Sequence, residues 1–78
     1  MTRKEIIDLA ISHAHGAIEQ FDPTAEYLTV WSYRDNLVDC LKEANVTDTN
    51  LWDLALRKYA VRVNYLAARA KLGRKFEI

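Results

Sequence analysis

The sequence NLWDLALRKYAVRVNYLAARAKL, residues 50–72, decides how this chain folds. It contains neither glycine nor proline and a single acidic residue, Asp53, so its residues favour a long helix. Thr49 or Asn50 is expected to cap the start of this helix, and Gly73 follows at a position where helices commonly end. The sequence therefore predicts a helix over residues 50–72.

Apolar residues run along this helix in two rows. The first row has the spacing of a heptad seam and comprises Trp52, Leu56, Tyr59, Val63, Leu66 and Ala70. The second row comprises Leu54, Val61, Tyr65, Ala68 and Leu72, with Lys58 interrupting it. At roughly 100° per residue, the two rows lie nearly back to back. A helix that is apolar on two sides is expected to pack against two partners, either two elements of its own chain or one element and another chain.

Basic residues fill the gaps between these rows, and the charge of the chain is unevenly distributed. Residues 1–56 hold ten acidic against four basic residues, a net charge of −6, and residues 57–78 hold seven basic residues against one acidic residue, a net charge of +6. The simpler interpretation is that the basic last helix neutralises an acidic body. The alternative is a basic surface that is kept for an acidic partner.

Length and composition indicate one folded domain. The chain has 78 residues, of which 50% are hydrophobic and 28% charged, as in folded rather than disordered proteins. A single cysteine permits no internal disulfide, so we expect a cytoplasmic protein. The first residues resemble neither a signal peptide nor a membrane span. The small size suggests a phage or mobile-element origin as a hypothesis.

The first part of the chain predicts an amphipathic helix over residues 3–21. Thr2 and Glu5 have the spacing of a capping box. The expected apolar face comprises Ile7, Ala10, Ile11, Ala14, Ala17, Ile18 and Phe21. Gly16 lies off this face, where another segment could approach closely.

A second helix is predicted over residues 23–44. Asp22 is expected as its cap and Pro23 as its first residue. Residues 27–33 are rich in aromatic and β-branched side chains and could instead be extended, with Ser32 capping a shorter helix. The apolar rhythm of Tyr27, Val30, Leu37, Leu41 and Ala44 favours the helix. A loop at 45–49 follows, and the tail at 74–78 is expected to fold back on the bundle.

These elements predict an all-α fold, a small three-helix bundle that runs up, down and up, with a long C-terminal helix. Two arrangements of the last helix stay open. In one, the first helix covers one apolar row and the second helix covers the other. In the alternative arrangement, both helices pack on the first row, and the second row is left for another chain.

The residues give no positive case for an enzyme, and we expect no cofactor and no metal. His13 and His15 lie two positions apart, so on a helix their side chains point away from each other and cannot hold one ion together. Cys40 lacks the spaced partners of a zinc site. No glycine-rich phosphate loop or nucleophile motif is present.

The leading hypothesis for function is a protein–protein interaction module, acting as a regulator, inhibitor or adaptor, with a homodimer as one form of it. The partner-binding residues that we predict are Leu54, Lys58, Val61, Arg62, Tyr65, Arg69 and Leu72. They combine the second apolar row with the basic residues beside it. Tyrosine and arginine are the types most enriched among residues that dominate binding energy.

The alternative hypothesis is binding to nucleic acid through the basic last helix and tail. Its residues would be Arg57, Lys58, Arg62, Arg69, Lys71, Arg74 and Lys75. The loop between two helices also suggests a helix-turn-helix. However, Trp52 and Asp53 occupy the first turn of the last helix, where polar base-reading residues would be expected, so insertion into a groove is disfavoured.

Overall fold

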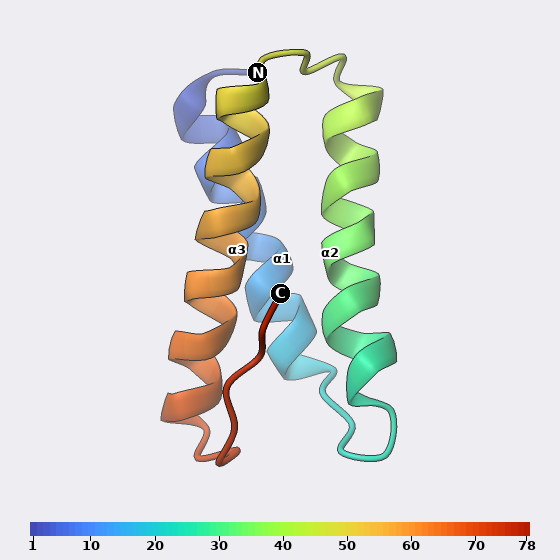
Figure 1. Cartoon of the computed structure of the whole chain (residues 1–78), viewed down its shortest axis with the longest axis vertical. Helices are drawn as coiled ribbons and strands as arrows, with labels where there is room; N and C mark the ends of the chain where they lie inside the picture. The colour runs from blue at the N-terminus through green and yellow to red at the C-terminus, as the bar shows by residue number, and fades with distance from the viewer.

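The computed structural model of the chain describes the whole backbone and every side chain except those of residues 26–28. Its helices are α1 (Arg3–Glu19), α2 (Glu26–Glu43) and α3 (Thr49–Arg69). As Figure 1 shows, α2 runs antiparallel to both α1 and α3, so the chain is an up-down-up three-helix bundle, as the sequence predicts. At 21 residues α3 is the longest helix, against 17 for α1 and 18 for α2.

The start of α1 is the expected capping box. The hydroxyl of Thr2 accepts a hydrogen bond of 3.1 Å from the backbone N–H of Glu5, whose carboxylate accepts one of 2.8 Å from the backbone N–H of Thr2. These bonds satisfy donors that a helix start leaves unpaired, and the bond from the Thr2 backbone is the main cause that lowers the pKa of Glu5. The prediction of this cap is confirmed.

The buried face of α1 is rotated relative to the sequence prediction. Ile6 is fully buried, whereas Ile7 and Ile11, which were expected on that face, are half-buried. The rest of the buried face consists of the small residues Ala10, Ala14 and Ala17, and for these three the prediction is confirmed. Short side chains let neighbouring backbones approach closely, so the position of the alanines, rather than that of the isoleucines, sets which side of α1 faces the bundle.

The start of α2 corrects the predicted cap. The helix begins at Glu26 rather than at Pro23, and Asp22 instead closes a turn in front of it. The Asp22 carboxylate accepts hydrogen bonds of 2.9 Å and 2.8 Å from the backbone N–H and the hydroxyl of Thr24. The first of these is the main cause that lowers the pKa of Asp22. Because the carboxylate is engaged locally, Ala25 becomes the N-cap without a side-chain bond.

Residues 27–33 belong to α2, so the extended alternative for this segment is wrong. Ser32 lies inside α2 and is therefore not the cap of a shorter helix. Val30, Leu37 and Leu41 are fully buried, as their spacing predicts. The expected place of Tyr27 on the same apolar face falls outside the described side chains.

The start of α3 lies one residue earlier than predicted. Asp48, rather than Thr49 or Asn50, is the N-cap, and its carboxylate accepts a hydrogen bond of 2.8 Å from the backbone N–H of Asn50. Three consecutive residues can serve as a cap here. Asp48 takes the position because its backbone is extended while that of Thr49 is already helical.

The end of α3 also differs from the prediction. The helix ends at Arg69, not at 72, and Lys71 adopts a left-handed backbone with φ of 55°. The N–H groups of Lys71 and Leu72 bond to helix carbonyls at 3.1 Å each, which completes a Schellman motif. Glycine normally occupies the position of Lys71, so the sequence pointed wrongly to Gly73.

The core lies between the three helices and is centred on the first apolar row of α3. Tyr59 and Val63 of that row are fully buried, and Trp52, Leu56 and Leu66 pack against the core while half-buried. Ala70, the last residue of the row, is exposed because α3 has ended. The first row is therefore the core-facing row of the monomer.

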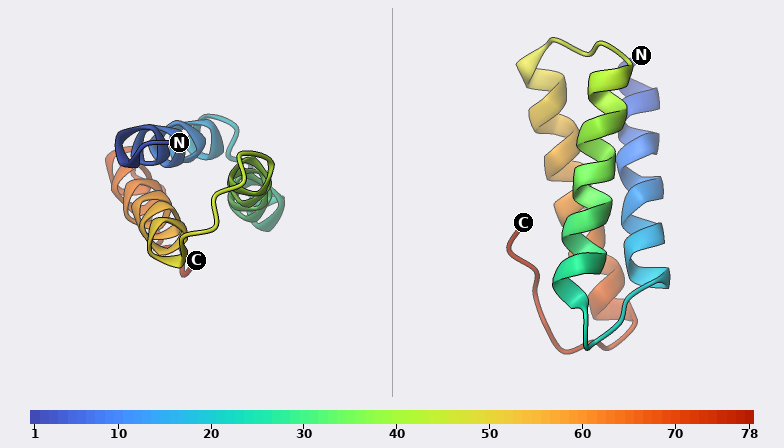
Figure 2. Two further views of the ribbon diagram at one scale, coloured as in Figure 1. Left: turned by 90° about the horizontal axis from the view of Figure 1, so that it is seen from above. Right: turned by 90° about the vertical axis from the view of Figure 1, so that its right-hand side faces the viewer.

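The three helices do not contact one another equally. Helix α1 packs extensively on α3 and also on α2, whereas α2 and α3 contact each other little. On the α2–α3 side the chain after α3 returns along the bundle, as the views from above and from the side show (Figure 2). Phe76 and Ile78 of this tail pack against the core, so its expected fold-back is confirmed. In the described part of the chain no helix is long and apolar enough to cross a membrane.

Candidate interaction surface on α3

Two large hydrophobic side chains of α3 are exposed to solvent. Val61 is 64% exposed and Tyr65 is 49% exposed, and both belong to the second apolar row. With the flanking basic residues they form a continuous strip along the helix, because positions three and four apart are neighbours on a helix surface. We call this strip the α3 surface and define it as Lys58, Val61, Arg62, Tyr65 and Arg69.

Tyr65 is held between two arginines. The guanidinium of Arg62 lies 5.4 Å from the centre of the Tyr65 ring, and that of Arg69 lies 5.8 Å from it. Arg69 also donates a hydrogen bond of 3.3 Å to the Tyr65 hydroxyl. Because Arg62 precedes the ring by about one turn and Arg69 follows it by about one turn, the cations approach from both directions along the helix. These contacts favour one arrangement of the three side chains.

The basic residues of the α3 surface have no acidic partner among the described side chains. The salt bridges that the structure places, Lys4–Asp8 and Arg57–Asp53, each lie within a single helix, and neither involves Lys58, Arg62 or Arg69. The interpretation that the last helix neutralises the acidic body is therefore not realised by ion pairs at these three residues. Their charge faces solvent, or a partner.

Two of the residues predicted for partner binding do not belong to this surface. Leu54 is only 8% exposed and is part of the core, and Leu72 is half-buried beyond the end of α3. The buried part of α3 is wider than one apolar row, because α1 packs closely over it and buries Ala55 and Ala67 as well. The placement of Leu54 at a partner surface is thus corrected, and the α3 surface keeps the other five residues.

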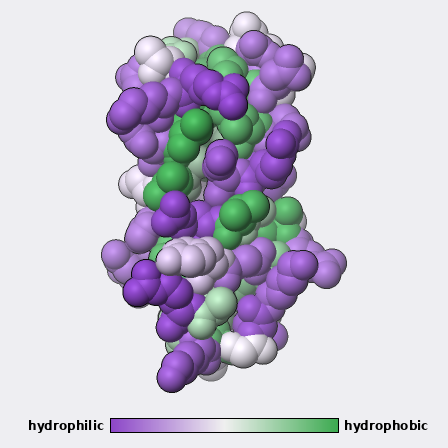
Figure 3. Space-filling model, turned by 90° about the vertical axis from the view of Figure 1, so that its left-hand side faces the viewer, coloured by the Kyte–Doolittle hydropathy of each residue, from purple (hydrophilic) through white to green (hydrophobic). Residues whose placement is uncertain are grey.

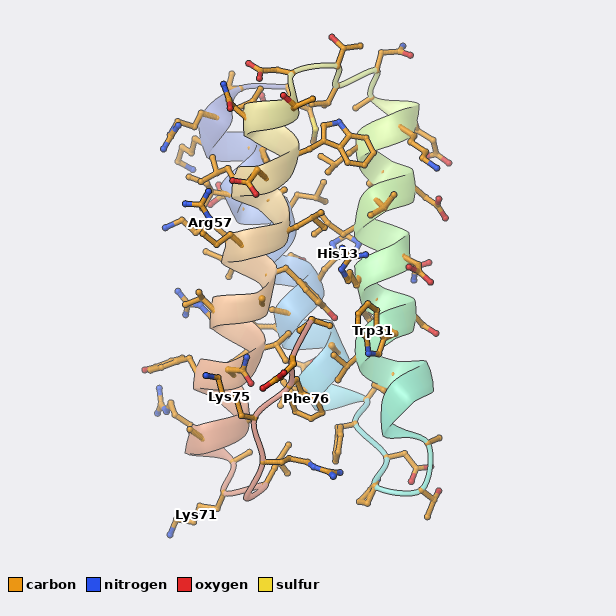
Figure 4. The ribbon with its side chains drawn as sticks, viewed as in Figure 1. His13, Trp31, Arg57, Lys71, Lys75 and Phe76 are labelled. Atoms are coloured by element: carbon orange, nitrogen blue, oxygen red, sulfur yellow. The ribbon has the colours of Figure 1, made fainter. Side chains whose placement is uncertain are left out.

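The residues of the nucleic-acid alternative do not gather in one place. Lys58, Arg62 and Arg69 lie along the α3 surface, whereas Arg57 forms its ion pair with Asp53. Arg57 and Lys71 point away from the bundle, and Lys75 lies on the returning tail (Figure 4). All of the predicted residues other than Arg62 are exposed, Arg74 among them.

Hydrophobic side chains are visible on the side of the bundle that α1 and α3 form. In the space-filling view of that side, hydrophobic patches interrupt a largely hydrophilic face (Figure 3). Val61 is an exposed aliphatic residue, and Ile7 and Ile11 of α1 are half-buried. An isolated exposed apolar residue is ordinary on a protein surface. Here Val61 lies about one turn from Tyr65, whose ring Arg62 and Arg69 contact.

His13 and Cys40 meet at the contact between α1 and α2. The Nδ1 atom of His13 lies 2.9 Å from the carbonyl oxygen of Leu9, and its Nε2 atom lies 3.9 Å from the Cys40 sulfur. A carbonyl can only accept, so Nδ1 carries the proton and the thiol donates weakly to Nε2. His15 is exposed. Among the described residues no pocket opens beside the pair, and no cluster of three metal-binding side chains forms.

Comparisons with known proteins give no relatives: no protein-family model matches the chain, and neither a curated protein nor a solved structure is significantly similar to it. The fold and the α3 surface therefore define the protein by class alone, as a small all-α bundle with one half-apolar, basic helix face.

Proposed function

We propose that this protein acts by binding another protein through the α3 surface. The observation that supports this most is the exposure of Val61 beside Tyr65, whose ring two arginines already hold in place. An ordered side chain loses less conformational entropy on binding, so it contributes more of its contact energy to affinity. Truncating a central tyrosine or arginine of such a surface typically weakens binding by about 1–3 kcal/mol.

The charge of the α3 surface selects an acidic partner. Lys58, Arg62 and Arg69 surround the apolar centre, and none is neutralised by a described acidic side chain. A second copy docked here about a two-fold axis would bring these cations against their own counterparts. Like charges facing each other across an interface cost affinity. A different protein, with carboxylates around an apolar residue, fits better than the homodimer that the sequence suggested.

The partner must also reach beyond α3. An ordinary stable interface covers about 800 Å² of each protein. The accessible surface of the whole chain is 5127 Å². An ordinary partner therefore covers roughly a sixth of the chain, more than five side chains of one helix provide. Because α1 packs extensively on α3, its half-buried Ile7 and Ile11 are the residues that we propose for the apolar extension of such an interface.

Affinity capture from the native host with mass spectrometry tests this proposal. The baits are the wild type, Tyr65→Ala, the charge reversal Arg62→Glu, and Lys42→Glu as a matched charge reversal on α2. We expect one protein to be enriched by the wild type and by Lys42→Glu, and to be lost with the two α3 variants. Equal recovery with all four baits would refute the role of the α3 surface. Circular dichroism checks that each bait is folded.

Nucleic acid is the second candidate, because Lys58, Lys71 and Lys75 are exposed and have no described acidic partner. Against it, Tyr65 is engaged by two guanidiniums, which leaves its ring less free to stack on a base. This function predicts binding that weakens steeply with salt and is lost when the basic residues are reversed. Absence of binding to DNA and RNA at about 50 mM salt would exclude it.

A further inference from the structure

The tail after α3 is held by hydrogen bonds between a side chain of α3 and the tail backbone. The side-chain carbonyl oxygen of Asn64 accepts a hydrogen bond of 2.6 Å from the Phe76 N–H, and its amide nitrogen donates one of 2.9 Å to the Phe76 carbonyl oxygen. The same nitrogen donates 3.1 Å to the carbonyl oxygen of Ala60, which fixes the orientation of the amide. A carboxamide that bonds both groups of one residue pairs with it as a neighbouring strand would, whatever the side chain.

The side chains of the tail alternate as they do in a bound extended peptide. Phe76 and Ile78 pack against the core, whereas Lys75 and Glu77 are exposed. The Phe76 ring meets that of Phe21 edge to face, with centres 5.7 Å apart and planes at 72°. Successive side chains of an extended segment point to opposite sides, so the spacing of two places both apolar residues inward.

The tail lies where the bundle leaves room for it. Helices α2 and α3 contact each other little, and the tail runs back beside α3 on this side with Phe76 directed inward (Figures 1 and 4). We call this location the tail site and define it by Asn64, Phe21 and the core between α2 and α3. The tail presents to this site an aromatic residue, Phe76, and an aliphatic residue two positions later, Ile78.

The connection to α3 lets the tail move without the helix. The Schellman motif closes α3 before the tail begins, so the cap does not depend on the tail. Gly73 then has φ of 72°, and a Cβ added to it would meet no atom within 4 Å. A glycine with open space around it, placed just after a closed helix cap, is a position that can absorb a hinge rotation.

We propose that the tail site is a peptide-binding site whose ligand is the segment Phe76-Glu77-Ile78, and that it accepts this segment from a second copy of the chain. The same sequence fits in both cases, so tails can exchange between two protomers without any new contact. A short tether gives its own tail a local concentration in the millimolar range. The self-docked form therefore dominates in dilute solution, and exchange begins at about millimolar protein. This inference uses none of the residues of the α3 surface.

Nuclear magnetic resonance of the full-length chain tests the site. Phe76→Asp should release the tail, because it deletes the contact with the Phe21 ring and would place a carboxylate against the apolar core. A synthetic peptide of residues 72–78 is then titrated while the side-chain amide signals of Asn64 are followed. We expect saturable shifts with the variant and about tenfold or more weaker binding to the wild type, whose own tail competes. A control peptide carrying the same Phe76→Asp change should not bind. The proposal would be overturned if the folded variant shows no shifts with the wild-type peptide, or if it binds the wild-type and control peptides equally.

Two further measurements complete the test. At about millimolar concentration, light scattering should detect a dimer fraction of the wild type that Phe76→Asp lacks, and a strictly monomeric wild type would overturn the exchange with a second copy.

If Phe76→Asp loses its helical signal, native-state hydrogen exchange of the wild type decides whether the tail is a separable ligand. The Phe76 amide should then exchange about tenfold or more faster than the amides of Ala14 and Ala17. Equal rates would mean that the tail leaves only on global unfolding, which refutes a separable ligand.

Discussion

Removing the hydroxyl of Tyr59 is expected to change both the stability of the bundle and its dependence on pH. The side chain is fully buried, and its hydroxyl donates a hydrogen bond of 2.5 Å to the carbonyl oxygen of Val30, which joins α3 to α2. Tyr59→Phe keeps the ring and deletes that bond. A neutral buried hydrogen bond of this kind contributes about 1 kcal/mol, so we expect Tyr59→Phe to lower the free energy of unfolding by about that amount at neutral pH.

The dependence on pH follows from burial of the same hydroxyl. Burial raises the pKa of Tyr59 above its ordinary value of 10.0. Above that pH the unfolded chain loses the proton while the folded chain retains it, so ionisation favours unfolding. The wild type should therefore lose about 1.4 kcal/mol of stability per pH unit above 10 from this residue, and nothing below it. Tyr59→Phe has no such loss, and the two stabilities should meet near about pH 11.

Urea unfolding followed by far-ultraviolet circular dichroism measures both effects. Curves for the wild type and Tyr59→Phe are collected at intervals from about pH 8 to about pH 11. The pKa of Lys4 is also raised, chiefly by its hydrogen bond to Asp8. The stability that this interaction provides is therefore lost as the pH rises into the alkaline range. That contribution is shared by both proteins and cancels in their difference. A difference in stability that is the same at pH 8 and at pH 11 would refute burial of the ionisable hydroxyl.

Substitutions at Lys71, Gly16 and Asp48 test the local structure by thermal or urea unfolding, with Tyr33→Ala and Thr49→Ala as controls. Lys71→Gly should stabilise the protein by about 1 kcal/mol, since glycine adopts the left-handed backbone at φ of 55° without strain; no gain would contradict the end that we assign to α3. Gly16→Ala should destabilise it, because a Cβ there would lie 2.6 Å from the Tyr33 ring. In a Tyr33→Ala background the same change should instead stabilise the helix by about 1 kcal/mol. Asp48→Ala should lower the free energy of unfolding by about 1 kcal/mol, and Thr49→Ala should lower it much less. A larger loss for Thr49→Ala would indicate that Thr49 is the cap of α3.

Sequence reasoning recovered the features of the fold that depend on local pattern. The capping box of Thr2 is specified by residues three apart, and the heptad spacing through Tyr59 and Val63 identified the row of α3 that faces the core. Both signals are complete within a few helical turns, so tertiary structure had little to add to them.

The ends of the helices and the full extent of the core were beyond that reasoning. Lys71 occupies a position that usually takes glycine, because the chain turns there to bring the tail back. Ala55 and Ala67 are fully buried although neither belonged to a predicted row. Neither alanine continues the spacing of a predicted row, and both are buried because the core covers more of α3 than one row. The alanines at 10, 14 and 17 were the available signal for the close contact of α1 with α3.

The α3 surface could be predicted in part, and of the tail site only the fold-back of the tail could be predicted. Val61 and Tyr65 stood out because an apolar row lay away from the first one, and their exposure agrees with that pattern. Leu54 was misplaced because its burial depends on how α1 lies across α3. The pairing of Asn64 with Phe76 joins residues 12 positions apart through a returning tail, and no periodic pattern encodes such a contact.

The most direct test of the proposed function is site-specific photo-crosslinking in the native host. A photoreactive phenylalanine analogue replaces Tyr65 in one chain and, as a control, the exposed Asp39 on α2 in another. We predict that position 65 yields one discrete adduct between this 9.0 kDa chain and a different, acidic protein, and that position 39 does not. An adduct of about twice the chain mass at position 65 would identify a second copy instead. No adduct at 65, or the same adduct at both positions, would contradict the role assigned to the α3 surface.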